Sequence, residues 1–167
     1  MEIRPAIAPD LPAIVAIYNA SIPSRTATAD TEPITVASRQ EWFAKHNSSR
    51  PLWVLEVEGA IGAWIGLTSF YGGRPAYNAT AEVSIYIAPP HQRKGYGSLL
   101  VQQMIDHCPS LGITTLLAMY FDHNTASQHL FTALGFEPMG HLAEIAILEG
   151  TKRGLVIAGK RIGATNL

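Results

Sequence analysis

The stretch that decides the fold reads IYIAPPHQRKGYGS and spans residues 85–98. Its first residues have the pattern of a strand, two prolines end that strand, and a Gly-x-Gly step leads into an amphipathic helix. Gly95 and Gly97 let the backbone approach a bound group closely. The N–H groups at the helix start favour an anion, and Arg93 and Lys94 add positive charge. The stretch therefore predicts a cradle for phosphate or pyrophosphate.

Two common phosphate-binding motifs do not occur here. A Walker A loop requires G-x-x-x-x-G-K-[ST], and the sequence has no such string. The dinucleotide fingerprint G-x-G-x-x-G requires a third glycine, and Leu100 stands at that position. A glycine-rich turn that only caps a helix is the alternative interpretation, so the rest of the chain has to decide between the two.

The order of elements around this stretch predicts a mixed α/β domain. Asp10 is predicted to cap the first helix, and Ser38-Arg39-Gln40-Glu41 has the spacing of a capping box. Antiparallel pairs come first and a β-α-β crossover follows, which predicts a mixed sheet. The predicted strands are 2–6, 52–57, 60–70, 80–88, 113–119 and two between 136 and 162, and the predicted helices are 10–21, a short one from 38, 95–107 and 124–134.

Composition limits the class of protein. The 167 residues predict a single domain, 1–167, and 47% hydrophobic against 15% charged residues excludes a disordered chain. The 12 Lys and Arg against 13 Asp and Glu give no basic bias, so no nucleic-acid partner is expected. No signal peptide and no apolar run of ~18 residues is seen, which predicts a cytoplasmic protein without a membrane partner.

The cysteine and histidines predict no further chemistry. Cys108 is the only cysteine, so an intrachain disulfide is excluded, and a buried filler is the expected role. The six histidines are scattered and show no H-E-x-x-H spacing, so no metal is expected.

Two downstream segments complete the pattern. Asn124-Thr125-Ala126-Ser127 opens a helix that ends at Leu134-Gly135-Phe136, and Gln92–Gly97 matches [QR]-x-x-G-x-[GA]. With this element order, the chain resembles the GCN5-related N-acetyltransferases (GNAT). The resemblance implies acetyl-CoA as co-substrate and a mostly antiparallel central sheet with one splayed parallel pair, flanked by helices.

A narrower resemblance rests on Tyr18-Asn19, Thr31-Glu32-Pro33, Ala76-Tyr77 and Thr80-Ala81-Glu82. These segments look like the phosphinothricin acetyltransferase branch, which includes enzymes acting on methionine sulfone and methionine sulfoximine. The similarity runs from about residue 2 to about residue 140. The Lys-[FH]-Gly-x-Trp-x-Asp-type string of that branch is replaced by LEGTKRGL at 148–155, a departure that concerns the acceptor. The branch also implies a homodimer.

The resemblance implies a role for each part of the site. Glu82 would be the general base, because the attacking amine has to lose a proton, and a solvent-facing strand carboxylate is the alternative. Asn124 would contact the cofactor arm, with a plain helix N-cap as the alternative. Arg74, Pro75, Ala76 and Tyr77, on the loop before the Glu82 strand, are the predicted acceptor-binding residues, because an arginine fork can bind a carboxylate or phosphinate, and a solvated loop arginine is the alternative. Acetyl-CoA would be bound by Ile85, Tyr86, Ile87, Gln92, Arg93, Lys94, Gly95, Tyr96, Gly97, Ser98, Asn124 and Ser127.

The general acid is left open by the sequence. Family members often use a tyrosine for the departing thiolate, and Phe131 stands at the corresponding position. Tyr120, His123 or solvent could supply the proton, or none is needed, since a thiol with a pKa of ~8.5 leaves readily.

The expected activity is N-acetylation of a small amino-acid-like acceptor by direct attack in a ternary complex. Acetylation of protein N-termini is an alternative that needs a groove for an extended peptide, and Arg74 and Tyr77 argue against such a groove. Acyl-CoA binding without turnover is the non-enzymatic alternative.

Overall fold

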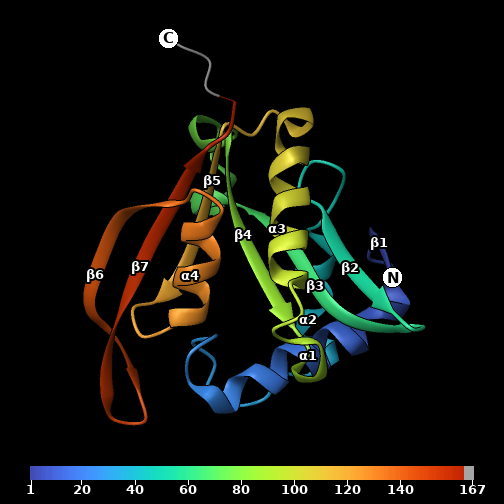
Figure 1. The fold of residues 1–167 in the computed structure, drawn as a ribbon, viewed down its shortest axis with the longest axis horizontal. Helices are drawn as coiled ribbons and strands as arrows, with labels where there is room; N and C mark the ends of the chain where they lie inside the picture. Colours follow the sequence, from blue (N-terminus) through green and yellow to red (C-terminus); the bar gives the residue numbers. More distant parts are fainter. Residues whose placement is uncertain (164–167) are drawn as a thin grey trace.

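One sheet organises residues 1–163, the part of the chain that the computed structural model describes (Figure 1). Within these residues the sheet has seven strands in the order β1-β2-β3-β4-β5-β7-β6. The strands are β1 Glu2–Pro5, β2 Leu52–Val57, β3 Ala60–Ser69, β4 Thr80–Ile87, β5 Thr115–Phe121, β6 Glu137–Leu148 and β7 Thr151–Arg161, and the α-helices are α1 Leu11–Ser21, α2 Val36–Ala44, α3 Tyr96–His107 and α4 Thr125–Ala133.

The centre of the sheet is a parallel pair that separates. β4 and β5 pair in parallel only over Thr80–Glu82 and Thr115–Leu117, whereas every other neighbouring pair is antiparallel. Beyond Glu82, β4 continues to Ile87 along β3, but no strand among residues 1–163 pairs with it on its β5 side. The predicted mixed sheet with a splayed parallel pair is confirmed.

Helices cover both faces of the sheet (Figure 1). On one face, Ala81 and Val83 of β4 pack with Leu100 and Val101 of α3, in a core to which α4 also contributes. The opposite face of the sheet packs against α1 and α2. The alternation predicted for β4 is therefore confirmed, and it directs Glu82, Ser84 and Tyr86 toward α1 and α2.

Two helix starts differ from the sequence prediction. The predicted start of α2 at Ser38 is wrong: α2 begins at Val36, because the Thr35 hydroxyl accepts the Ser38 N–H at 3.1 Å. Asp10 does precede α1, but its carboxylate makes no cap bond. It accepts two hydrogen bonds from Arg4, at 2.7 and 3.0 Å, and one from the Ile7 N–H, so it fixes β1 to the start of α1 instead.

The remaining differences are small. β5 begins at Thr115, two residues later than predicted, because Ile113 belongs to the turn that follows Gly112. Cys108 is fully buried, as expected for a filler. In the part of the chain described, no helix combines the length and the apolar character needed to cross a membrane.

Candidate active site

The loop between β4 and α3 contains the two glycines of the predicted phosphate cradle. Gly95 has the positive φ that the pattern predicts, and Gly97 does not. Gly95 has a φ of +82° and stands immediately before α3, and Arg93 also has a positive φ, of 59°. Gly97 lies inside the helix, where an added Cβ would be 3.4 Å from Ile87 and Leu130. Gly95 therefore shapes the turn, whereas Gly97 keeps the helix close to its neighbours.

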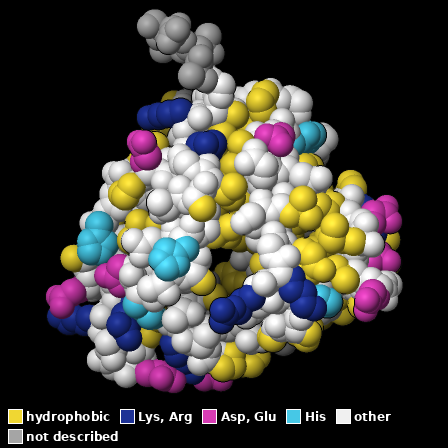
Figure 2. Space-filling model, in the orientation of Figure 1, with side chains coloured by type: hydrophobic (Ala, Val, Ile, Leu, Met, Phe, Trp, Pro, Cys, Tyr) yellow, Lys and Arg dark blue, Asp and Glu magenta, His cyan; other side chains and the backbone are white. Residues whose placement is uncertain are grey.

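The start of α3 is open to a ligand. No side chain in the described part of the chain caps this helix, and the first N–H groups of a helix have no acceptor within it. Arg93 and Lys94 are exposed and make no ion pair within residues 1–163. Figure 2 shows a hollow between α3 and α4 with basic side chains at its rim. Gln92 is tied back, because its amide donates to the Ile87 carbonyl at 3.2 Å.

Glu82 lies where β4 leaves β5, since it pairs with Leu117 at the last position of the parallel ladder. Its carboxylate makes no hydrogen bond and no ion pair within the described residues. Burial raises the pKa of Glu82 above the ordinary carboxyl value. A partly buried, unpaired carboxylate with a raised pKa is suited to accepting a proton.

Asn124 holds the start of α4. Its side-chain oxygen accepts the Ser127 N–H at 3.0 Å, which is an N-cap bond. Its amide donates to the Thr26 carbonyl at 3.1 Å, and the neighbouring His123 bonds the Arg25 carbonyl at 2.8 Å. The N-cap interpretation of Asn124 therefore describes its contacts, and the segment between α1 and α2 is bonded to the start of α4.

The region of the missing tyrosine is aromatic. Phe131 of α4 stacks on Tyr120 of β5, with ring centres 6.0 Å apart and planes 7° apart. Burial raises the pKa of the Tyr120 phenol, whose hydroxyl makes no hydrogen bond among the described residues. Since His123 is engaged with Arg25, Tyr120 is the less constrained of the two acid candidates.

The loop that carries the predicted acceptor residues is exposed. Residues 74–77 form a short turn, in which the Tyr77 N–H donates to the Arg74 carbonyl at 2.8 Å. The Tyr77 ring packs edge-on against Phe70 and Tyr71. The Arg74 side chain makes no hydrogen bond or ion pair to Glu82, so the structure brings these two residues to the same end of β4 without a direct contact.

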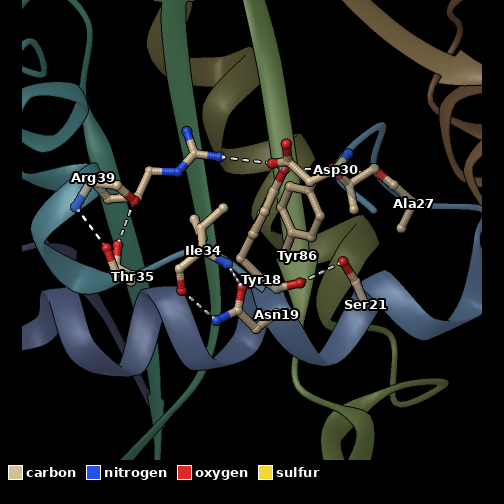
Figure 3. A network of polar contacts seen from close by, with 11 residues as sticks. Tyr18, Asn19, Ser21, Ala27, Asp30, Ile34, Thr35, Arg39 and Tyr86 are labelled. Atoms are coloured by element: carbon tan, nitrogen blue, oxygen red, sulfur yellow. Dashed lines mark hydrogen bonds and ion pairs between the residues drawn. The ribbon is translucent and has the colours of Figure 1, made fainter. Parts of the chain in front are cut away.

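The sequence did not predict the cluster of side chains around Tyr86 on the α1–α2 face of β4. Tyr86 stacks on Trp64, with ring centres 4.8 Å apart, and its hydroxyl donates to the Ala27 carbonyl at 3.1 Å. Asp30 accepts a hydrogen bond from the Tyr18 hydroxyl and faces the guanidinium of Arg39 (Figure 3). Arg39 lies in a stretch with capping-box spacing and Trp64 has no local pattern that marks a site, so only their position beside Tyr86 reveals this cluster.

A splayed parallel pair, with an open helix start and a basic glycine loop beside the gap, is the arrangement that the resemblance to the acetyltransferases predicts. The chain belongs to the Acetyltransferase (GNAT) family, whose model matches residues 14–136. It is therefore an acetyl-CoA-dependent N-acetyltransferase of this family.

Within this family, the chain is similar to acetyltransferases with related names. YwnH from Bacillus subtilis, named as a candidate phosphinothricin acetyltransferase, is 49% identical over 163 residues, which cover 97% of this chain and 99% of YwnH. The L-methionine sulfoximine/L-methionine sulfone acetyltransferase of Pseudomonas paraeruginosa is 34% identical, covering 86% and 84%. A phosphinothricin acetyltransferase from Sinorhizobium meliloti, crystallised with acetyl-CoA, superposes with a TM-score of 0.90 at 28% identity, covering 97% and 88%.

Proposed function

We propose that the chain acetylates the α-amino group of a small amino acid whose side chain resembles phosphinothricin, methionine sulfoximine or methionine sulfone. The single observation that supports this most is the unpaired Glu82 carboxylate, at the point where β4 leaves β5. The names of the relatives support the same class of acceptor.

Acetyl-CoA supplies the acetyl group as a thioester, and the residues at the splay fit such a ligand. The free edge of β4 beyond Glu82 can pair with an extended arm through the backbone of Ile85, Tyr86 and Ile87. The uncapped start of α3 suits a pyrophosphate. The proposed contacts are completed by Gln92, Arg93, Lys94, Gly95, Tyr96, Gly97, Ser98 and the start of α4 at Asn124 and Ser127.

The proposed chemistry is a direct transfer in a ternary complex. Glu82 takes a proton from the acceptor ammonium, directly or through one water, and so frees the nitrogen lone pair. The nitrogen attacks the thioester carbonyl, and an N–H group of β4 stabilises the charge that develops on oxygen. The nitrogen, now positively charged, releases its second proton to solvent, and the C–S bond breaks to leave the amide and the thiolate. The thiolate takes a proton from solvent or from Tyr120. We propose that Arg74 and the adjoining residues Pro75, Ala76 and Tyr77 bind the acceptor carboxylate.

Thiol release from acetyl-CoA tests the proposal. L-phosphinothricin, methionine sulfoximine and methionine sulfone are compared with a polyamine, an aminoglycoside and a short peptide at equal concentrations. Turnover on the first three supports the proposal. Turnover on the peptide alone would assign the chain to protein N-terminal acetylation, and acetyl-CoA binding without any turnover would assign it to acyl-CoA binding.

We also propose a homodimer that works in the cytoplasm. The edge strand β6 exposes large apolar side chains, among them Leu142, Ile145 and Ile147, which are 42%, 59% and 67% exposed. A long edge strand with such side chains favours association. The single thiol, Cys108, is buried and needs no oxidising compartment. Light scattering at micromolar concentration should give twice the mass of one chain.

A further inference from the structure

A cavity lies on the face of β3 and β4 that α1 and α2 cover. Its volume is about 170 Å³, which is similar to cavities that hold a benzene-sized molecule. Four aromatic rings and several polar side chains form its wall, together with apolar residues. The lining residues are Ile14, Val15, Tyr18, Ile34, Arg39, Trp42, His46, Trp64, Gly66, Thr68, Ser84 and Tyr86.

Arg39 is the cation of this cavity, and most of its hydrogen-bonding capacity is unused. Its guanidinium carbon lies 4.8 Å from the ring centre of Tyr18 and 5.3 Å from that of Trp42. A guanidinium carries five N–H donors, yet this one makes no hydrogen bond within residues 1–163. Its one ion pair, to Asp30, has an N–O distance of 3.6 Å (Figure 3). The side chain is only 26% exposed, so water does not fully replace the missing partners.

Asp30 does not occupy the whole fork of Arg39, since their single ion pair joins one nitrogen to one oxygen. The Asp30 carboxylate already accepts the Tyr18 hydroxyl, and Thr28 holds the same turn through the Asp30 N–H at 3.2 Å. The two aromatic faces fix the guanidinium in place without occupying its N–H groups. A planar donor fork is thus positioned in the cavity wall, where an oxygen-bearing group can reach it.

The cavity begins next to Glu82. Thr68 lies directly across from Glu82 in the β3–β4 ladder, and Ser84 follows two residues later on the same face. Both line the cavity, and neither side chain makes a hydrogen bond among the described residues. Residues two apart on a strand are roughly 6.5 Å apart. In the proposed acceptors four bonds separate the amine nitrogen from phosphorus or sulfur, a span of roughly 5 Å.

We propose that Arg39 is a specificity-determining residue that binds the terminal oxo group of the acceptor side chain while the amine lies at Glu82. This inference rests on the proposed function. The guanidinium donates to the oxygens of a phosphinate, sulfoximine or sulfone, and Thr68 and Ser84 line the path from Glu82. The aromatic wall at Trp42 packs against the terminal methyl group.

The chemistry of the three acceptors sets an order for the effect of Arg39. A phosphinate is anionic and forms two charge-assisted hydrogen bonds with a guanidinium, which are stronger than bonds between neutral groups. A sulfone or sulfoximine offers neutral oxygens, so its loss on removing Arg39 is smaller. Methionine has the same backbone and chain length but no oxo group, so its acetylation does not depend on Arg39.

The test compares kcat/KM for phosphinothricin, methionine sulfoximine and methionine in the full-length protein and in Arg39→Met. We expect a loss of about 30-fold for phosphinothricin and about fivefold for the sulfoximine. The value for methionine should stay within about twofold. Lys45→Met is the control, since it removes one exposed positive charge beside the same helix.

A second variant and a binding measurement keep the inference open to refutation. Arg39→Lys retains a charge but loses the fork, and it should lose about fivefold on phosphinothricin alone. Calorimetry with phosphinothricin in the presence of CoA measures acceptor binding without turnover. Equal losses on phosphinothricin and methionine in both variants, or unchanged phosphinothricin binding in Arg39→Met, would overturn the inference.

The outcomes also separate this inference from the proposed function. A wild-type protein that acetylates these amino acids without any selective effect of Arg39 keeps the proposed function and rejects the role of Arg39. A wild-type protein that neither acetylates nor binds any of them rejects both.

Discussion

The two faces of β4 offer different kinds of recognition. On the α3 side, the free edge of β4 and the uncapped start of α3 present backbone groups, and the turn depends on Gly95. On the α1–α2 side, Arg39 and its aromatic neighbours present side-chain groups around a cavity. Backbone groups are the same for most sequences, whereas a cavity changes with one substitution. The α3 side is thus suited to a ligand that stays the same, as we propose for acetyl-CoA, and the α1–α2 side to a ligand that varies, as we propose for the acceptor.

Glu82, on the α1–α2 face of β4 at the last residue of the parallel ladder, should give the largest effect. Glu82→Gln keeps the shape of the side chain but cannot take a proton. We expect kcat to fall about 100-fold or more, while the dissociation constant for acetyl-CoA changes less than about twofold. Steady-state kinetics and calorimetry measure the two quantities. Glu41→Gln, at an exposed carboxylate paired with Lys45, is the control. An equal fall in turnover and acetyl-CoA affinity would contradict the assignment of Glu82 as base.

The pH dependence should follow from the raised pKa of Glu82. Below that pKa the carboxyl is protonated and cannot act as a base, so kcat/KM for the acceptor falls about tenfold per pH unit on the acid side. The midpoint of this limb should lie above the ordinary carboxyl value. A profile recorded with Glu82→Gln should lack the limb with this midpoint and should rise only where the acceptor ammonium itself loses its proton. A limb that persists with an unchanged midpoint would indicate another group.

The raised pKa of Glu82 also affects the free energy of unfolding. A raised carboxyl pKa means that the folded state holds its proton to a higher pH than the unfolded state does. The contribution of Glu82 to stability therefore falls as pH rises from the unfolded pKa to the folded pKa. Above this window Glu82→Gln should be the more stable protein, which thermal unfolding at neutral pH can measure.

The backbone side is tested at Gly95. An alanine there meets no atom within 4 Å, so its whole cost comes from the φ of +82°. We expect a loss of about 1–2 kcal/mol in the free energy of unfolding, or of acetyl-CoA binding if the loop relaxes. Calorimetry and thermal unfolding separate the two. Arg39-dependent acceptor selectivity should be unchanged, and a change in it would show that the two faces are not independent.

The smallest effect is expected at Asn124. Asn124→Ala removes the N-cap of α4 and the bond to Thr26, and should cost about 1 kcal/mol of unfolding free energy. Asn124→Asp retains an oxygen for the cap and should cost less. If Asn124→Asp instead weakens acetyl-CoA binding tenfold at unchanged stability, its amide contacts the cofactor in solution.

The sequence predicts the local structure around Gly95 and Glu82 better than it predicts the cavity under α1 and α2, and the reason is physical. The turn at Gly95 and the strand that carries Glu82 depend on neighbours within a few residues, so a short stretch is enough to identify them. The cavity is assembled from α1, α2, β3 and β4, and no local pattern distinguishes it. Trp64 has the pattern of a core residue and is indeed buried, which hides its place in the cavity wall.

Arg39 and Asn124 each lie in a stretch whose sequence pattern has two interpretations. Arg39 lies within a stretch that has capping-box spacing, but Thr35 provides the cap and leaves Arg39 free to reach the cavity. Asn124 fits both a helix cap and a cofactor contact, and its observed bonds are those of a cap. For α2 the deciding atom belongs to Thr35, which lies outside the pattern, whereas for Asn124 it is the N–H of Ser127, which lies inside it.

The three-residue ladder between β4 and β5 has a consequence for the stability of the whole protein. Strands β1 to β4 and strands β5, β7 and β6 form two well-bonded ribbons, and only Thr80–Glu82 joins one ribbon to the other through sheet pairing. A ligand that pairs with the open edge of β4 beyond Glu82 adds hydrogen bonds between the two ribbons. Its binding free energy then adds to the free energy needed to separate the two ribbons. The melting temperature should therefore rise with the concentration of the ligand.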